Sequence, residues 1–142
     1  MIMKTQHQSG SAAIEFALVL PLFISLFLGV IEISIGLYNK AVITNASREA
    51  ARAGILLRSP KPSVTDLKKI IVDTAIRYCS ENLITFGNAN DPVISVPVIS
   101  QTFGSPLTVT VSYQYKGIGF TPIFNAATGR GNLVATTVMN NE

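Results

Sequence analysis

The feature that most constrains this chain is a long apolar run near its N-terminus. No charged residue occurs between Phe16 and Ile31, and the apolar character resumes after Glu32 in the stretch ISIGLY. At a rise of about 1.5 Å per residue, a helix over residues 11–38 would be about 40 Å long, which exceeds a hydrocarbon core of about 30 Å. The run predicts one transmembrane helix, with Glu15 and Glu32 near opposite faces of the bilayer.

A secretory signal peptide is the main alternative for such a run. The apolar core of a signal peptide is about 7–15 residues long and ends at a small-residue cleavage site. This run is longer, and no A-x-A-like exit follows it. The polar leader before it, MIMKTQHQSG, covers residues 1–10 and ends in Gly10. If this leader is removed, the cut precedes the apolar helix and leaves it on the mature protein.

Small residues recur at every fourth position of the predicted helix. In a helix they form one ridge, which would let the backbone of another helix approach closely. Small residues and proline are also common in membrane helices without such a role. The proline of the ridge lacks a backbone donor and predicts a kink. The ridge consists of Ala13, Ala17, Pro21, Ser25 and Gly29.

A carboxylate stands at the start of the apolar run. Near the end of a membrane span, Glu15 costs energy unless it is paired, and such residues usually have a function. A cut after Gly10 would place a new α-amine on Ser11, four positions before Glu15. That amine could pair with Glu15 of its own chain or of an adjacent chain. The alternative is an unpaired carboxylate that reaches to the membrane interface.

The charges of the chain are few and scattered. Its formal net charge is +3, and it shows no basic stripe of the kind that binds nucleic acid, so no nucleic-acid partner is expected. Lys4 and the α-amine precede the predicted span, while Lys40, Arg48, Arg52 and Arg58 follow it. By the positive-inside rule alone, this count favours a cytoplasmic C-terminus.

Helical patterns continue beyond the span. Pro60 and Pro62 end a predicted stalk helix over residues 39–59, and Ser63 with Asp66 resembles a capping box that starts a second helix ending near Asn82. The apolar stripe of the stalk consists of Val42, Ala46, Ala50, Ala53 and Leu57. The apolar face of the second helix consists of Val64, Leu67, Ile71, Ala75 and Tyr78.

After FGNANDP, the apolar period changes from that of a helix to that of a strand. The segment around Ile94, Val96 and Val98 predicts an edge strand or a bulge, because Pro97 interrupts it. LTVTVSYQY predicts a second strand, GSP a hairpin turn before it, and LVATTVMN a third strand. With KGIGFTPIFNAATGRG as a surface loop, residues 60–142 are expected to form a small α+β domain, in which one helix covers an antiparallel sheet. The apolar face of the second strand consists of Leu107, Val109, Val111, Tyr113 and Tyr115.

Few residues of the chain offer chemistry. The single histidine, His7, lies in the leader, and no Cys–His pair, paired metal-binding histidines or G-x-S-x-G elbow is present. GIGFTPIF contains a G-x-G without the third glycine that dinucleotide binding needs. The lone Cys79 is expected to be a small, partly buried helix residue, with an intermolecular disulfide as the alternative. We expect no enzymatic activity, cofactor or metal site.

Two stretches carry a family resemblance. GSAAIEFALVLPLF is similar to the processing site of type IV pilin-like proteins, with glycine before the cut and glutamate at the fifth mature position. Together with NASREAARAGI, it resembles the TadE-like minor pilins, or pseudopilins, of tight-adherence (Flp, type IVb) pili. The resemblance is strongest over Gly10 to Ile55 and weaker in TVSYQYKGIGFTPIF and LVATTVMNNE.

The resemblance implies a site, a topology and partners. A membrane-embedded aspartyl prepilin peptidase would cut between Gly10 and Ser11 at the cytoplasmic face of the bacterial inner membrane. The C-terminal domain would then be extracytoplasmic, against the charge count, and Glu15 would pair with a neighbour's terminal amine. The implied partners are the peptidase, other TadE-like or TadF-like minor pilins, the major pilin and the inner-membrane assembly platform.

Two other functions fit the same sequence. One is an uncleaved, single-pass anchored binding domain outside the cell membrane, for which the helix is only a tether. The other is a pseudopilin that contacts DNA during uptake, which would require salt-sensitive duplex binding by residues 39–142. Glu15 separates the first from the pilin hypothesis, because a tether should tolerate its replacement.

Overall fold

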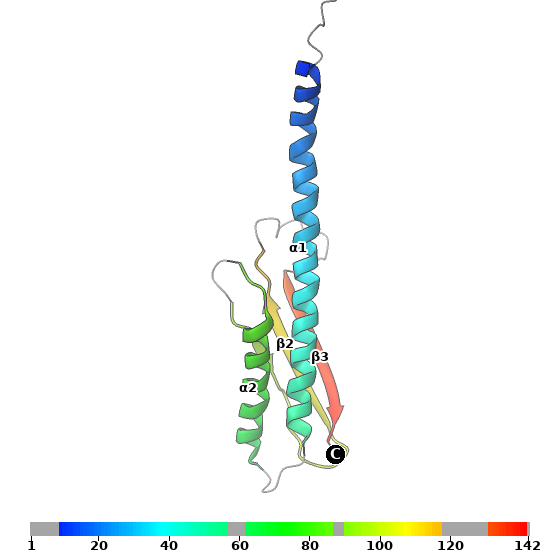
Figure 1. Cartoon of the computed structure of the whole chain (residues 1–142). Coiled ribbons are helices and arrows are strands. Elements are labelled where there is room, and N and C mark those ends of the chain that lie inside the picture. The colour runs from blue at the N-terminus through cyan, green and yellow to red at the C-terminus, as the bar shows by residue number, and fades with distance from the viewer. Residues whose placement is uncertain (1–8, 57–61, 87–89, 118–130, 142) are drawn as a thin grey trace, which may run out of the picture.

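The structure is a computed structural model, which describes residues 9–56, 62–86, 90–117 and 131–141. Its elements are α1 (Ser9–Ile55), α2 (Val64–Asn82), β1 (Val93–Ser95), β2 (Pro106–Gln114) and β3 (Asn132–Asn140). The first half of α1 projects from the rest as a rod, and its second half packs with α2 against the sheet (Figure 1). This arrangement confirms the predicted α+β class.

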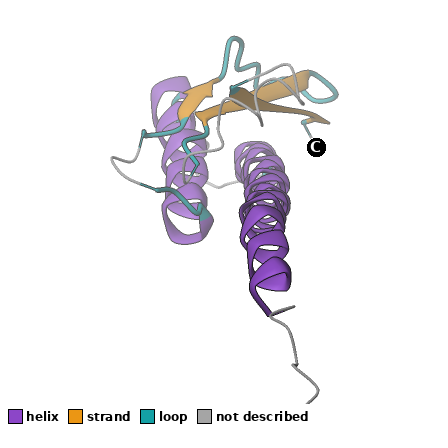
Figure 2. Ribbon diagram, turned by 90° about the horizontal axis from the view of Figure 1, so that it is seen from above, coloured by secondary structure: helices purple, strands orange, loops and turns teal. Residues whose placement is uncertain are grey.

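The sheet has helices on one side. Figure 2, which looks along α1, shows α1 and α2 side by side on the same face of the sheet. The sequence predicted one covering helix, and the structure has two. The reason is that the predicted stalk, the second half of α1, packs on the sheet beside α2 and forms part of the helical layer.

A stripe of small residues lets α1 lie close to the sheet. At Gly54, an added Cβ would stand 2.5 Å from Leu107 Cδ2 of β2 and 2.8 Å from Ile71 Cδ1 of α2. Three elements therefore meet where a side chain is missing. Leu57 of the predicted stripe lies outside the described residues. The other predicted members are buried or, for the last of them, half-buried: Val42, Ala46, Ala50 and Ala53.

The start of α2 follows the capping prediction. The Ser63 hydroxyl accepts a hydrogen bond from the Asp66 backbone N–H at 3.1 Å and donates one to the Asp66 carboxylate at 2.7 Å. The cap thus satisfies a backbone donor that the first helical turn leaves free. The buried face repeats every four residues and consists of Leu67, Ile71, Ala75 and Cys79. Val64 is exposed and Tyr78 is half-buried at the border of the core, which corrects the predicted face.

β2 is the central strand of a three-stranded antiparallel sheet with the order β1-β2-β3. β1 is short and lies at an edge, as Pro97 predicted. Before β2, the Ser105 N–H donates to the Thr102 carbonyl at 3.1 Å, and Gly104 has a φ of 77°. This is a β-turn over Thr102–Ser105 with Gly104 at the position of positive φ, and it begins two residues before the predicted GSP. The predicted inward face is buried throughout: Leu107, Val109, Val111, Tyr113 and Tyr115.

Candidate functional site on the N-terminal helix

The N-terminal half of α1 has no covering layer. Every residue of the segment 10–27, called here the bare segment, is exposed. Its most apolar window has a mean hydropathy of 2.5, and none of that window is buried in the fold. Among the described residues, α1 is one helix long and apolar enough to cross a membrane. A core helix is mostly buried, and this window is exposed along its whole length in the described structure.

Large apolar side chains cover the bare segment on all sides. In water, an uncovered surface of this size would associate or aggregate. In lipid, it is the surface that a spanning helix requires. Its exposed large residues are Ile14, Phe16, Leu18, Val19, Leu20, Leu22, Phe23, Ile24, Leu26 and Phe27.

The predicted processing and pairing residues lie at the tip of the bare segment. Gly10 and Ser11 are exposed in the first turns of α1, and a Cβ added at Gly10 would meet no atom within 4 Å. Packing among the described residues therefore gives no reason for a glycine at this position. The Ser11 hydroxyl donates to Glu15 Oε1 at 3.3 Å, so the two side chains face each other one turn apart.

Four of the five residues of the predicted small-residue ridge are left uncovered by the described part of the fold. Ala13, Ala17, Pro21 and Ser25 are exposed, and a Cβ at Gly29 would meet no atom within 4 Å. α1 continues through Pro21 without a break, and Figure 1 shows no sharp bend in its bare half. The expected kink is thus not present. The Ser25 hydroxyl donates to the Pro21 carbonyl one turn earlier, at 2.7 Å.

Burial along α1 begins at the end of the bare segment. Leu28 and Gly29 are half-buried, and Glu32 is only 1% exposed. The last turns of the predicted span, up to Tyr38, therefore share the helix with the domain. Gly36 and Asn39 are also buried, at helical spacing from Glu32.

Glu32 lies against the end of β2. The Glu32 carboxylate acts on the Tyr115 hydroxyl through its charge. Burial, followed by the charge of Glu32, raises the pKa of Tyr115 to about 12. A Cβ at Gly117 would fall 1.3 Å from Glu32 Oε1, so the glycine backbone occupies the space beside the carboxylate. The sequence placed Glu32 at a bilayer face, and the structure adds these partners from the domain.

Two further polar residues of α1 are buried, and the sequence reasoning missed both. The Asn39 amide donates to the Ile84 carbonyl at 2.6 Å and accepts from the Ile84 N–H at 2.9 Å. The Ser47 hydroxyl lies 2.7 Å from the Thr137 hydroxyl of β3. Together with Glu32, they contact three different parts of the domain. Their helical spacing within an apolar stripe was the signal that could have found them.

The described part of the domain holds few groups that could carry chemistry. Cys79 is free and buried, and burial raises the pKa of its thiol to about 11, which disfavours the reactive thiolate. Among the described residues, no three His, Cys, Asp or Glu side chains lie close enough to hold a metal ion. A shallow open depression on the outer face of the sheet is lined by neutral amides, a serine, a valine and one carboxylate. Its lining is Asn90, Asp91, Val93, Ser112, Gln114 and Asn132.

One known protein family matches the sequence of this helix. The sequence model of the TadE-like protein family matches residues 10–52, which include the bare segment and most of the buried half of α1. Over these residues, the match confirms the TadE-like resemblance and supports a pilus-associated protein with a membrane-anchoring helix. No curated protein and no solved structure matches the chain.

Proposed function

We propose that this chain is a minor pilin or pseudopilin, a structural subunit in the assembly of a tight-adherence pilus. The observation that carries the proposal is the bare segment. It is an exposed apolar helix within a TadE-like match, and Glu15 is the one charged residue between Gly10 and Ile31. The subunit acts through non-covalent contacts and catalyses no reaction.

The first step in this proposal is removal of the leader. A prepilin peptidase cuts between Gly10 and Ser11, where the chain is exposed and glycine serves no packing role among the described residues. The leader lies in the cytoplasm, and the α+β domain lies outside the inner membrane. The cut produces a positively charged α-amine on Ser11.

The second step is pairing within the membrane. Ser11 and Glu15 already face each other across one helical turn, so an amine on Ser11 can reach the carboxylate of its own chain. When subunits lie side by side, the same carboxylate can accept the amine of a neighbour. An ion pair of this kind is strong in lipid, because no water competes for either charge.

The third step is docking of helices. In the ridge of Ala13, Ala17, Pro21, Ser25 and Gly29, the first four residues are exposed in the bare segment and a Cβ at Gly29 would meet no atom within 4 Å; small side chains permit close backbone approach. The candidate neighbours are other TadE-like or TadF-like subunits, the major pilin and the membrane platform.

An uncleaved, membrane-anchored binding domain is the second candidate. The observation in its favour is that the described part of the domain packs on residues 28–55 of α1, while residues 10–27 are exposed. A plain tether needs the same apolar length. It needs neither the cut at Gly10 nor the carboxylate of Glu15.

Two measurements in the native host separate these candidates. The first is the intact mass and N-terminal residue of the membrane-extracted protein: Ser11 supports the pilin, and Met1 in cells with an active prepilin peptidase supports the tether. The second is a pilus count for Glu15→Ala beside Glu49→Ala, an exposed glutamate on the domain half of the same helix. We expect pili to be lost in the first variant alone, and an unchanged count in both would refute the assembly role of Glu15.

A further inference from the structure

The length of helix left bare fixes how far the domain stands from the bilayer. Residues 10–27 are about 27 Å long as a helix, and the segment up to Ile31, where burial is still partial, is about 33 Å long. These two lengths bracket a hydrocarbon core of about 30 Å. If the bare segment fills the core, no spacer remains between the core and the domain.

The part of the domain at that boundary is the end of β2. Glu32 is 1% exposed and holds Tyr115 and the backbone of Gly117 against α1. Figure 1 shows β2 running toward the bare half of α1, so this end of the sheet faces the membrane. Between the two held residues stands Lys116, which is exposed.

Lys116 is a residue type suited to the boundary between the hydrocarbon core and the lipid headgroups. Tyr115 points into the core, so Lys116 follows the outward alternation of the strand, as the exposed Gln114 does. A lysine can lay its apolar stem along the interface while its ammonium reaches a lipid phosphate. Tyr115 and Gly117, the neighbours of Lys116, lie against Glu32 of α1. Their contact with the helix fixes the height of Lys116 relative to the span.

We propose that the domain rests directly on the lipid headgroups, with Tyr115–Gly117 at headgroup level and Lys116 against the phosphates of anionic lipid. The inference rests on the membrane span in the proposed function. It does not depend on the cut at Gly10 or on pilus assembly. A protein held above the bilayer could bind this end of the domain only if Tyr115–Gly117 stood away from the lipid.

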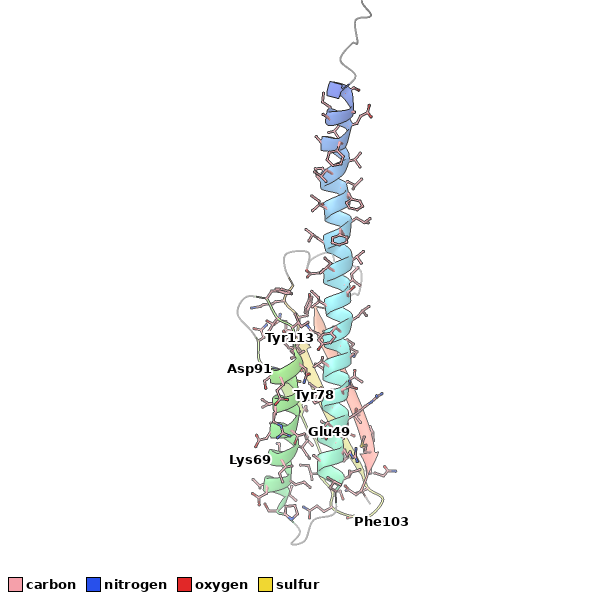
Figure 3. All side chains as sticks on the ribbon, viewed as in Figure 1. Glu49, Lys69, Tyr78, Asp91, Phe103 and Tyr113 are labelled. Carbon is pink, nitrogen blue, oxygen red and sulfur yellow. The ribbon has the colours of Figure 1, made fainter. Side chains whose placement is uncertain are left out.

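The test is a depth measurement on the full chain in phosphatidylcholine vesicles that contain phosphatidylglycerol. A fluorescent thiol label is placed at Leu22→Cys, Gln114→Cys or Phe103→Cys, with the buried Cys79 left in place. Phe103 is 86% exposed and lies at the end of the domain away from the bare segment (Figure 3). Quenching is then compared between lipids with a nitroxide on the headgroup and lipids with one deep in the acyl chain.

We expect the label at 22 to be quenched from the acyl chain, the label at 114 from the headgroup, and the label at 103 from neither. Equal headgroup quenching at 114 and 103, with 22 still in the acyl region, would overturn the inference and leave the span intact. Failure of acyl-chain quenching at 22 would overturn both the span and the inference.

The lysine contact has its own control. In vesicles with phosphatidylglycerol, the Lys116 amine should react with a membrane-impermeant amine reagent several-fold more slowly than in vesicles of phosphatidylcholine alone. The Lys69 amine should react at the same rate in both, because Lys69 is exposed on α2 far from the bare segment (Figure 3). An unchanged rate at Lys116 would refute its contact with the phosphate of anionic lipid.

Discussion

Asn39 gives the most direct test of how the domain is held on α1. Its side chain is fully buried and makes two hydrogen bonds to the backbone of Ile84, at 2.6 Å and 2.9 Å. Asn39→Ala removes both bonds and leaves the N–H and the carbonyl of Ile84 without these partners. Each hydrogen bond contributes about 0.5–1.5 kcal/mol net. Because Ile84 is 40% exposed, water can take the place of the lost amide, so we expect a loss of about 1–3 kcal/mol, the sum of the two bonds.

The assay is urea unfolding of the full chain in mild detergent, followed by near-ultraviolet circular dichroism of the buried tyrosines. Asn45→Ala is the matched control, because Asn45 is exposed on the same helix six residues further on. Asn39→Asp adds a second check: it should regain stability on acidification, since a protonated carboxyl can again donate to the Ile84 carbonyl. If Asn39→Ala stayed within about 0.5 kcal/mol of the control, the clamp would not be a determinant of stability.

Three further predictions follow from the packing and the pKa values. Gly54→Ala should destabilise the fold by about 1–3 kcal/mol, because the added Cβ would press on Leu107. Gly29→Ala should be close to neutral, because a Cβ there would meet no atom within 4 Å. Urea unfolding measures both changes in stability. Cys79 should resist alkylation at pH 8 in the native protein and react in urea, because burial raises its pKa to about 11; equal rates would show that the site opens freely. Tyr115 is neutral in the fold and has a pKa raised from 10.0 to about 12, so the stability it contributes should be complete below pH 10 and be lost as the pH rises toward 12. A Tyr115→Phe variant should lack that loss when unfolding is followed against pH.

Much of the architecture could be predicted because it depends on patterns that are local in the chain. The uncharged run from Phe16 to Ile31 allows only a long apolar helix, and the capping residues Ser63 and Asp66 set the start of α2. The alternation of apolar and polar residues along β2 predicted which of its side chains are buried. It also predicted the burial of Tyr115, which follows the end of the strand. Each of these signals acts within a few residues, and propensity and periodicity report on that range.

The missed features depend on contacts between distant parts of the chain. Val64 and Tyr78 fit an apolar face by spacing, but the position of α1 beside α2 turned the buried face toward Cys79. Asn39 and Ile84 are 45 residues apart, so nothing local indicates their pairing.

The N-terminal helix shows the same division. The sequence by itself determined that the helix is apolar, long enough to span a membrane, and marked at its tip by Gly10, Ser11 and Glu15. Where the domain begins on that helix was decided only by tertiary structure. From the sequence alone, a glutamate in an apolar run indicates a bilayer boundary. Hydropathy includes the cost of burying a charge, but it does not include the tertiary contacts around that charge. In the folded protein, Glu32 lies beside Tyr115 and the backbone of Gly117, buried at the junction of span and domain.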